Sequence, residues 1–133
     1  MLLVWSLATA AVGMLASPSS SKGERITAGP WGGVHIALNV GEKDAQVEMD
    51  CAHGTIDEVI MLDNKGHFDV AGRYVRERPG PLREGDDTTG RPARYLGDRS
   101  GDKLTLTIVL EGGDKVGPYE LTRGGRARVM KCR

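Results

Sequence analysis

Apolar residues recur at every second position over much of the chain after residue 30, which is the pattern of strands with one buried face. Residues 34–40 and 47–51 both follow it, with Val, Ile, Leu, Met or Cys at alternate positions. Polar residues and a glycine at 41–46 separate the two runs, so we expect a hairpin there. No window of about 11 residues in this part of the chain shows a helical stripe.

Six further segments with strand character follow, and turn sequences such as 63–66 and 98–102 separate most of them. We therefore predict an all-β fold, a small antiparallel up-and-down β-barrel of about eight strands, because closure removes exposed sheet edges. A flattened β-sandwich is the alternative. The six segments are residues 55–62, 67–77, 93–97, 103–111, 116–122 and 127–132.

The first 16 residues differ from the rest because they are mostly apolar and contain no charged side chain. This run is short for a membrane span, and a Pro/Ser stretch follows it, so we interpret residues 1–16 as a signal peptide. An uncleaved N-terminal anchor is the alternative. Residues 17–30 are then a flexible segment and residues 31–133 a single barrel domain. We expect a periplasmic or extracellular protein, with no stable membrane insertion once the leader is removed.

Export predicts a disulfide between Cys51 and Cys132, because oxidising compartments favour pairing and a metal site needs more than two thiols. In a closed meander the last strand pairs with the first, so the second strand lies about 9.5 Å away. A disulfide requires Cα atoms about 5.5–6 Å apart. Either Cys132 lies beyond its strand and folds across one end of the barrel, or the ring is not closed in simple strand order; we favour the first.

The charge balance and the histidines exclude several kinds of site. With 18 Lys+Arg and 18 Asp+Glu, the formal net charge is +0, so we predict no nucleic-acid partner. Matching Val40 with Val47 across the first hairpin directs His53 into the barrel and His35 outward. The same reasoning places His67 outside, so the three histidines do not converge. We predict no metal site and no cofactor.

The same parity places Met49, His53 and Tyr74 on the inner face. His53 has two interpretations. It is either a hydrogen-bonded histidine of the core or rim, or one polar contact of a ligand pocket at a barrel mouth, with Tyr74 as the other. The candidate ligand-binding residues are His53, Tyr74, Met49 and Trp31, although Trp31 is also interpreted as a plug for the open end.

Several short motifs resemble a group of uncharacterised small secreted bacterial proteins. They are Trp31-Gly32-Gly33-x-His35, Asp50-Cys51-Ala52-His53-Gly54, Gly72-x-Tyr74, Leu104-Thr105-Leu106-Thr107 and the terminal Lys131-Cys132. The resemblance implies secretion and no particular activity. The opening Trp-Gly strand followed by short meander strands is also similar in layout to lipocalin-like and avidin-like barrels, which implies a small apolar ligand.

The hypothesis that follows is a non-catalytic binding protein, whose partner is a small molecule at the mouth or an extracellular protein held by the loops. One alternative is a small secreted enzyme with His53 as general base, assisted by Tyr74 or Asp50. Another is a structural module of the cell envelope.

Overall fold

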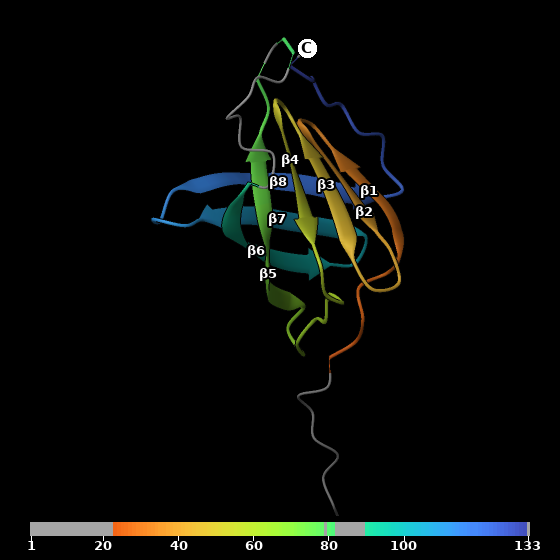
Figure 1. The fold of residues 1–133 in the computed structure, drawn as a ribbon. Coiled ribbons are helices and arrows are strands. Elements are labelled where there is room, and N and C mark those ends of the chain that lie inside the picture. Colours follow the sequence, from red (N-terminus) through yellow and green to blue (C-terminus); the bar gives the residue numbers. More distant parts are fainter. Residues whose placement is uncertain (1–22, 79, 82–89, 133) are drawn as a thin grey trace, which may run out of the picture.

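The structure is a computed structural model that describes residues 23–78, 80–81 and 90–132. Eight antiparallel strands in sequential order close into one barrel, which confirms the predicted up-and-down β-barrel (Figure 1). In the described residues no helix is long and apolar enough to cross a membrane. The strands are β1 (Gly29–Gly33), β2 (Ile36–Val40), β3 (Ala45–Met49), β4 (Ala52–Ile56), β5 (His67–Arg76), β6 (Arg91–Ser100), β7 (Lys103–Leu110) and β8 (Lys115–Arg123).

The barrel is built from two groups of strands that cross each other (Figure 1). The strands β1 to β4 have five residues each, whereas β5 to β8 have eight to ten. Strand β5 connects the groups, because its second half pairs with β4 while most of its length pairs with β6. The chain reverses at each connection, so the β1–β2, β3–β4, β5–β6 and β7–β8 connections share one end of the barrel, called here the pocket end.

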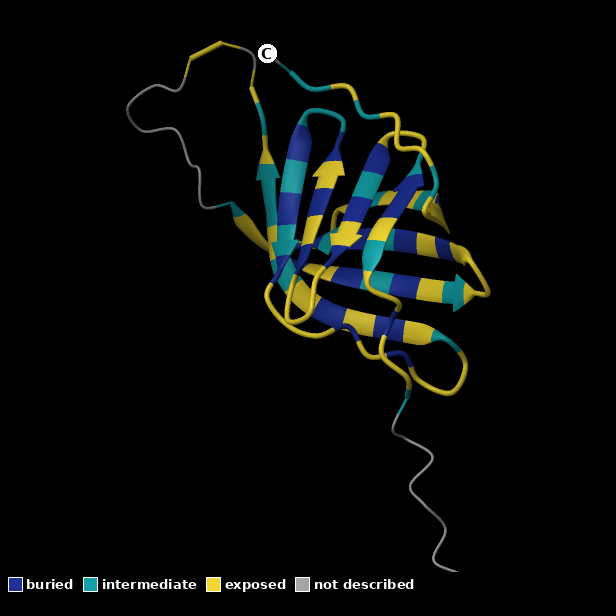
Figure 2. Ribbon diagram, turned by 90° about the vertical axis from the view of Figure 1, so that its right-hand side faces the viewer, coloured by how far each residue is buried: buried dark blue, intermediate teal, exposed yellow. Residues whose placement is uncertain are grey.

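Buried side chains form one cluster in the barrel interior. The alternation of buried and exposed residues follows the strands (Figure 2). Trp31 and Tyr95 are the largest of the fully buried side chains. Gly54 and Gly72 make room for the Tyr95 ring, since a Cβ at Gly54 would lie 1.9 Å from the Tyr95 hydroxyl oxygen. That hydroxyl donates a hydrogen bond of 2.7 Å to the Arg73 carbonyl. The barrel is therefore a packed core with little room for a ligand at its centre.

The predicted register of the first hairpin is wrong by two residues. Val40 pairs with Ala45, and Ile36 pairs with Met49. Strands β3 and β4 are joined by a tight turn in which Cys51 has a φ of 54°. After this turn, the even-numbered and odd-numbered residues exchange faces relative to β3, because each residue added or removed in a turn moves the following side chains to the other face. Ala52 consequently points inward, and His53 lies on the outer face.

Three predicted strands also differ from the observed ones. The first predicted strand, 34–40, begins two residues too early, because β2 starts at Ile36 and Val34 is 58% exposed in the β1–β2 turn. Strand β1, which precedes that turn, was not among the predicted strands. The predicted strand 55–62 ends at Ile56, and Met61 is exposed beyond it. The predicted strand 127–132 is wrong. Residues 124–132 form instead a segment that runs back beside β1, which we call the C-terminal strap (Figure 1).

The C-terminal strap crosses the pocket end and closes the disulfide between Cys51 and Cys132, whose Cα atoms lie 4.8 Å apart. The prediction that Cys132 lies beyond the last strand and folds across the barrel end is confirmed. Along the way, the His35 amide donates to the Arg128 carbonyl at 2.7 Å, and the Cys51 amide donates to the Met130 carbonyl at 3.1 Å. A disulfide is consistent with an oxidising compartment.

The N-terminal residues lie at the opposite end. The predicted signal peptide, 1–16, and residues 17–22 of the predicted flexible segment lie outside the described residues. From residue 23 onward the chain packs on the barrel: Ile26 is buried, and its amide donates to the Ile60 carbonyl at 3.1 Å. The Trp31 indole donates to the Thr27 carbonyl at 3.1 Å, so this segment covers the buried tryptophan.

Candidate functional site

A pocket of about 700 Å³ lies at the pocket end, between the end of β5, the start of β6 and the β7–β8 turn. We call it the mouth pocket. A second, shallower hollow lies near Met61 and His67, but its Asp63 carboxylate is already bonded to the amides of Lys65 and His67. The mouth pocket is lined by charged, aromatic and apolar side chains, among them His53, Tyr74, Arg76, Glu77, Arg78, Arg91, Leu110, Asp114, Val116 and Cys132.

Strand register places an aromatic ring and two arginines together at the rim. Tyr74 on β5 is the Cα partner of Arg91 on β6. Arg76 follows Tyr74 by two residues, so alternation puts it on the same side of the sheet. Tyr74 is partly buried and packs against the core, whereas both arginines are exposed. The apolar floor therefore carries two cationic side chains above it.

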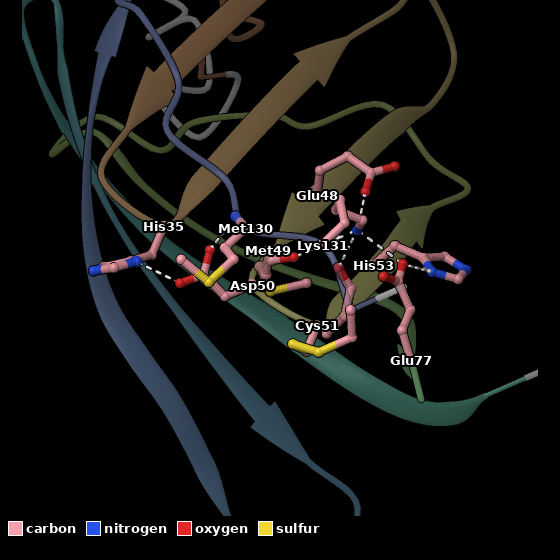
Figure 3. The surroundings of a disulfide bond; sticks show 11 residues. His35, Glu48, Met49, Asp50, Cys51, His53, Glu77, Met130 and Lys131 are labelled. Carbon is pink, nitrogen blue, oxygen red and sulfur yellow. Dashed lines mark hydrogen bonds and ion pairs between the residues drawn. A yellow bond between two sulfur atoms is a disulfide. The ribbon is translucent and has the colours of Figure 1, made fainter. Parts of the chain in front are cut away.

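His53 reaches the mouth pocket from the outer face of β4, where its Nδ1 atom lies 2.8 Å from the Glu77 carboxylate (Figure 3). Its side chain is 40% exposed. The Glu77 carboxylate also forms an ion pair with Lys131 of the C-terminal strap, whose Nζ atom lies 2.8 Å from Oε2. Burial works to raise the pKa of Glu77, but the hydrogen bonds from Lys131 and His53 outweigh it and lower that pKa. Glu77 is thus held as a carboxylate.

Lys131 is the centre of a clasp that fixes the strap (Figure 3). Besides Glu77, its ammonium group contacts the Glu48 carboxylate at 2.6 Å and the carbonyls of Met49 and Ala52 at 3.4 and 3.1 Å. Partial burial would lower the pKa of Lys131, yet the two carboxylates raise it. These partners balance the positive charge of the ammonium group and occupy its three N–H donors. Lys131 therefore holds the strap, and few of its donors remain for a ligand.

Asp50 forms a second anchor for the strap. Its carboxylate accepts a hydrogen bond of 2.7 Å from the Met130 amide and also contacts the His35 ring. The Met130 amide is the main cause that lowers the pKa of Asp50, against the opposing effect of burial. Asp50 is therefore occupied away from His53, and the predicted assistance of His53 by Asp50 is wrong.

The contact between His53 and Glu77 could also serve a chemical role. A carboxylate on Nδ1 fixes the orientation of an imidazole and stabilises its charged form, as required of an oriented general base. No serine, threonine or free cysteine is among the described residues that line the mouth pocket, since Cys132 is in the disulfide. Without a side-chain nucleophile beside it, such a base would act by moving a proton on a bound molecule or by activating a water molecule.

The four candidate ligand-binding residues separate into two pairs. His53 and Tyr74 both line the mouth pocket, although His53 does so from the outer face and not from the inner face as predicted. Trp31 and Met49 are each 1% exposed in the core and do not line it. They pack in the interior as the alternation requires, so their size and apolarity serve the fold.

Sequence reasoning missed the charged residues of this end. Arg76 continues the inward alternation of β5, so the pattern alone contained a signal for it. Arg91 had none, because β6 begins two residues before the predicted segment 93–97. The Glu77 to Lys131 contact joins residues 54 positions apart and depends on the path of the strap.

The histidines do not converge on one centre in the described part of the chain. His35, His53 and His67 contact three different carboxylates, those of Asp50, Glu77 and Asp98. Within the described residues, no group of three or more His, Cys, Asp or Glu side chains is placed to hold a metal ion.

Comparison with known protein families, with curated proteins and with solved structures finds no match for this chain.

Proposed function

We propose that the protein is a secreted or periplasmic binding protein that holds a small molecule in the mouth pocket. The observation that supports this is the pocket itself, whose volume of about 700 Å³ is in the range of small-molecule sites. Its lining combines an apolar floor, formed by Tyr74, Leu110 and Val116, with a few polar groups at the rim. This combination is typical of sites that bury an apolar body and orient it by a small number of polar contacts.

The packed core favours binding at the mouth over binding at the barrel centre. Tyr95 and Trp31 occupy the interior that a hollow barrel would offer to a ligand. A molecule in the mouth pocket would instead rest on Leu110 and Val116 and stay accessible from solvent. The disulfide and the resemblance to small secreted proteins support the proposed location outside the cytoplasm.

Native mass spectrometry of the protein purified from its own host tests this proposal. We expect a bound small molecule on the unmodified protein and none on a Val116→Trp variant, because the indole would occupy the pocket floor. Thr105→Trp, on the exposed outer face of β7, is the matched control and should keep the molecule. Far-UV circular dichroism establishes that each variant is folded. An unmodified protein without any adduct, or an adduct that Val116→Trp retains, would count against the proposal. Co-purification of a protein in its place would favour the alternative of an extracellular partner held by the loops.

A small enzyme is the second candidate, and the contact of His53 with Glu77 favours it. In this hypothesis His53 accepts a proton from a molecule bound beside Tyr74, and Glu77 stabilises the imidazolium that forms. A panel of hydrolase and isomerase substrates tests it. Any activity should be lost in His53→Ala and reduced in Glu77→Gln. An activity that His53→Ala retains in full eliminates this role.

A further inference from the structure

We infer that the mouth pocket selects molecules that carry an anionic group on an apolar body, an inference that rests on the proposed function. Arg76 and Arg91 stand on the inner side, and the Glu77 carboxylate is already neutralised by Lys131 at 2.8 Å. Asp114 in the β7–β8 turn is the opposing carboxylate. Arg78 also lines the pocket, so among the described lining residues three guanidinium groups stand against Asp114, which leaves this part of the rim with a positive excess.

The register brings the guanidinium groups of Arg76 and Arg91 within reach of one anion. Arg91 is opposite Tyr74, and Arg76 is the next residue on that side of β5, so the two arginines are diagonal neighbours. Diagonal neighbours on adjacent strands lie about 7–8 Å apart, which long side chains easily span. Like charges at such positions repel each other, and an anion between them removes the repulsion.

Arg91 is also oriented for such a contact. Its Nη2 atom donates a hydrogen bond of 2.6 Å to the Glu111 carbonyl, which holds the guanidinium beside the β7–β8 turn. A guanidinium has five N–H donors, so this contact leaves several for a ligand. Carboxylates, sulfonates and phosphates match its planar fork in charge and geometry. The apolar body would then lie against Tyr74 and Val116, below the charged rim.

Two dyes with the same aromatic body give a direct test. N-phenyl-1-naphthylamine is neutral, and 8-anilinonaphthalene-1-sulfonate adds a sulfonate to the same framework. We expect the folded, oxidised protein to bind the sulfonate dye about tenfold more tightly than the neutral dye in fluorescence titrations. This preference should fall as salt is added, because the arginines are exposed to solvent.

Variants separate this inference from the proposed function. The double variant Arg76→Gln and Arg91→Gln should lose the preference for the sulfonate dye and keep its affinity for the neutral one. Arg94→Gln is the matched control, because Arg94 is on β6 and pairs with Asp69 at 2.7 Å on the outer face. It should keep the preference. Val116→Trp should abolish binding of both dyes.

Each outcome decides between the two claims. Equal affinity for both dyes, with both lost in Val116→Trp, would overturn the anionic selectivity and leave the pocket as a binding site. A preference that persists in the double arginine variant would do the same. If neither dye binds, or if Val116→Trp leaves the binding of both dyes unchanged, the inference is overturned and the proposed function is weakened as well.

Discussion

The disulfide gives the prediction with the most definite magnitude. We consider a variant in which both Cys51 and Cys132 are replaced by serine. The bond joins residues 81 positions apart, and the chain-entropy relation for a loop of this length gives a loss of about 4.5 kcal/mol in the free energy of unfolding. Since small domains are stable by only about 5–15 kcal/mol, this is a large part of the total.

The structure indicates that this loss arises mainly in the unfolded chain. Without the disulfide, the strap keeps its other contacts, including the hydrogen bond from the Arg128 amide to the Gly33 carbonyl at 3.1 Å and the Lys131 clasp. The native barrel should therefore change little. The unfolded chain, released from its cross-link, gains conformational entropy and exposes more surface.

Urea denaturation followed by far-UV circular dichroism measures both effects. The serine variant should have the lower free energy of unfolding and a larger dependence on urea concentration, because this slope increases with the surface exposed on unfolding. Thiol titration of the denatured, unreduced protein should find no free thiol on the unmodified chain. A loss below about 1 kcal/mol with an unchanged slope would refute the reasoning, because the cross-link would then constrain nothing.

Three further predictions concern the packed core and the clasp. Tyr95→Phe removes the hydrogen bond to the Arg73 carbonyl and should lower the free energy of unfolding by about 1–2 kcal/mol in urea denaturation; no change would mean that the bond is not formed. Gly54→Ala should cost about 2–3 kcal/mol, because the new Cβ would lie 1.9 Å from the Tyr95 hydroxyl oxygen. The double variant with Tyr95→Phe should then cost less than the sum of the two, and simple additivity would contradict this account. For Glu77, Lys131 and His53 lower the pKa against the effect of burial. Its contribution to stability is therefore present above the ordinary pKa of 4.5 and is lost as the pH falls through the lower folded value. Glu77→Gln should show a smaller loss of stability between about pH 5 and pH 3 than the unmodified protein, and identical pH profiles would exclude the clasp as a source of acid sensitivity.

The amino-acid sequence by itself determined the fold class. A period of two predicts strands at residues 67–77 and 103–111, where β5 and β7 lie, because a half-buried strand requires that alternation. Spacing and edge closure then predict the barrel. The sequence also favoured a position of Cys132 beyond the last strand, because strand spacing and disulfide geometry do not allow the bond within a ring closed in simple order.

Only the tertiary structure decided which way the site residues face. Alternation fixes relative orientation within a strand, but each turn sets the parity of the strand that follows, and one residue more or less reverses it. At the β3–β4 turn, the C-terminal strap decides this, because Met130 and Cys132 hold Asp50 and Cys51 from about 80 residues away. His53 faces outward for that reason. The pairing of Arg91 opposite Tyr74 likewise depends on where β6 begins, which local sequence did not reveal.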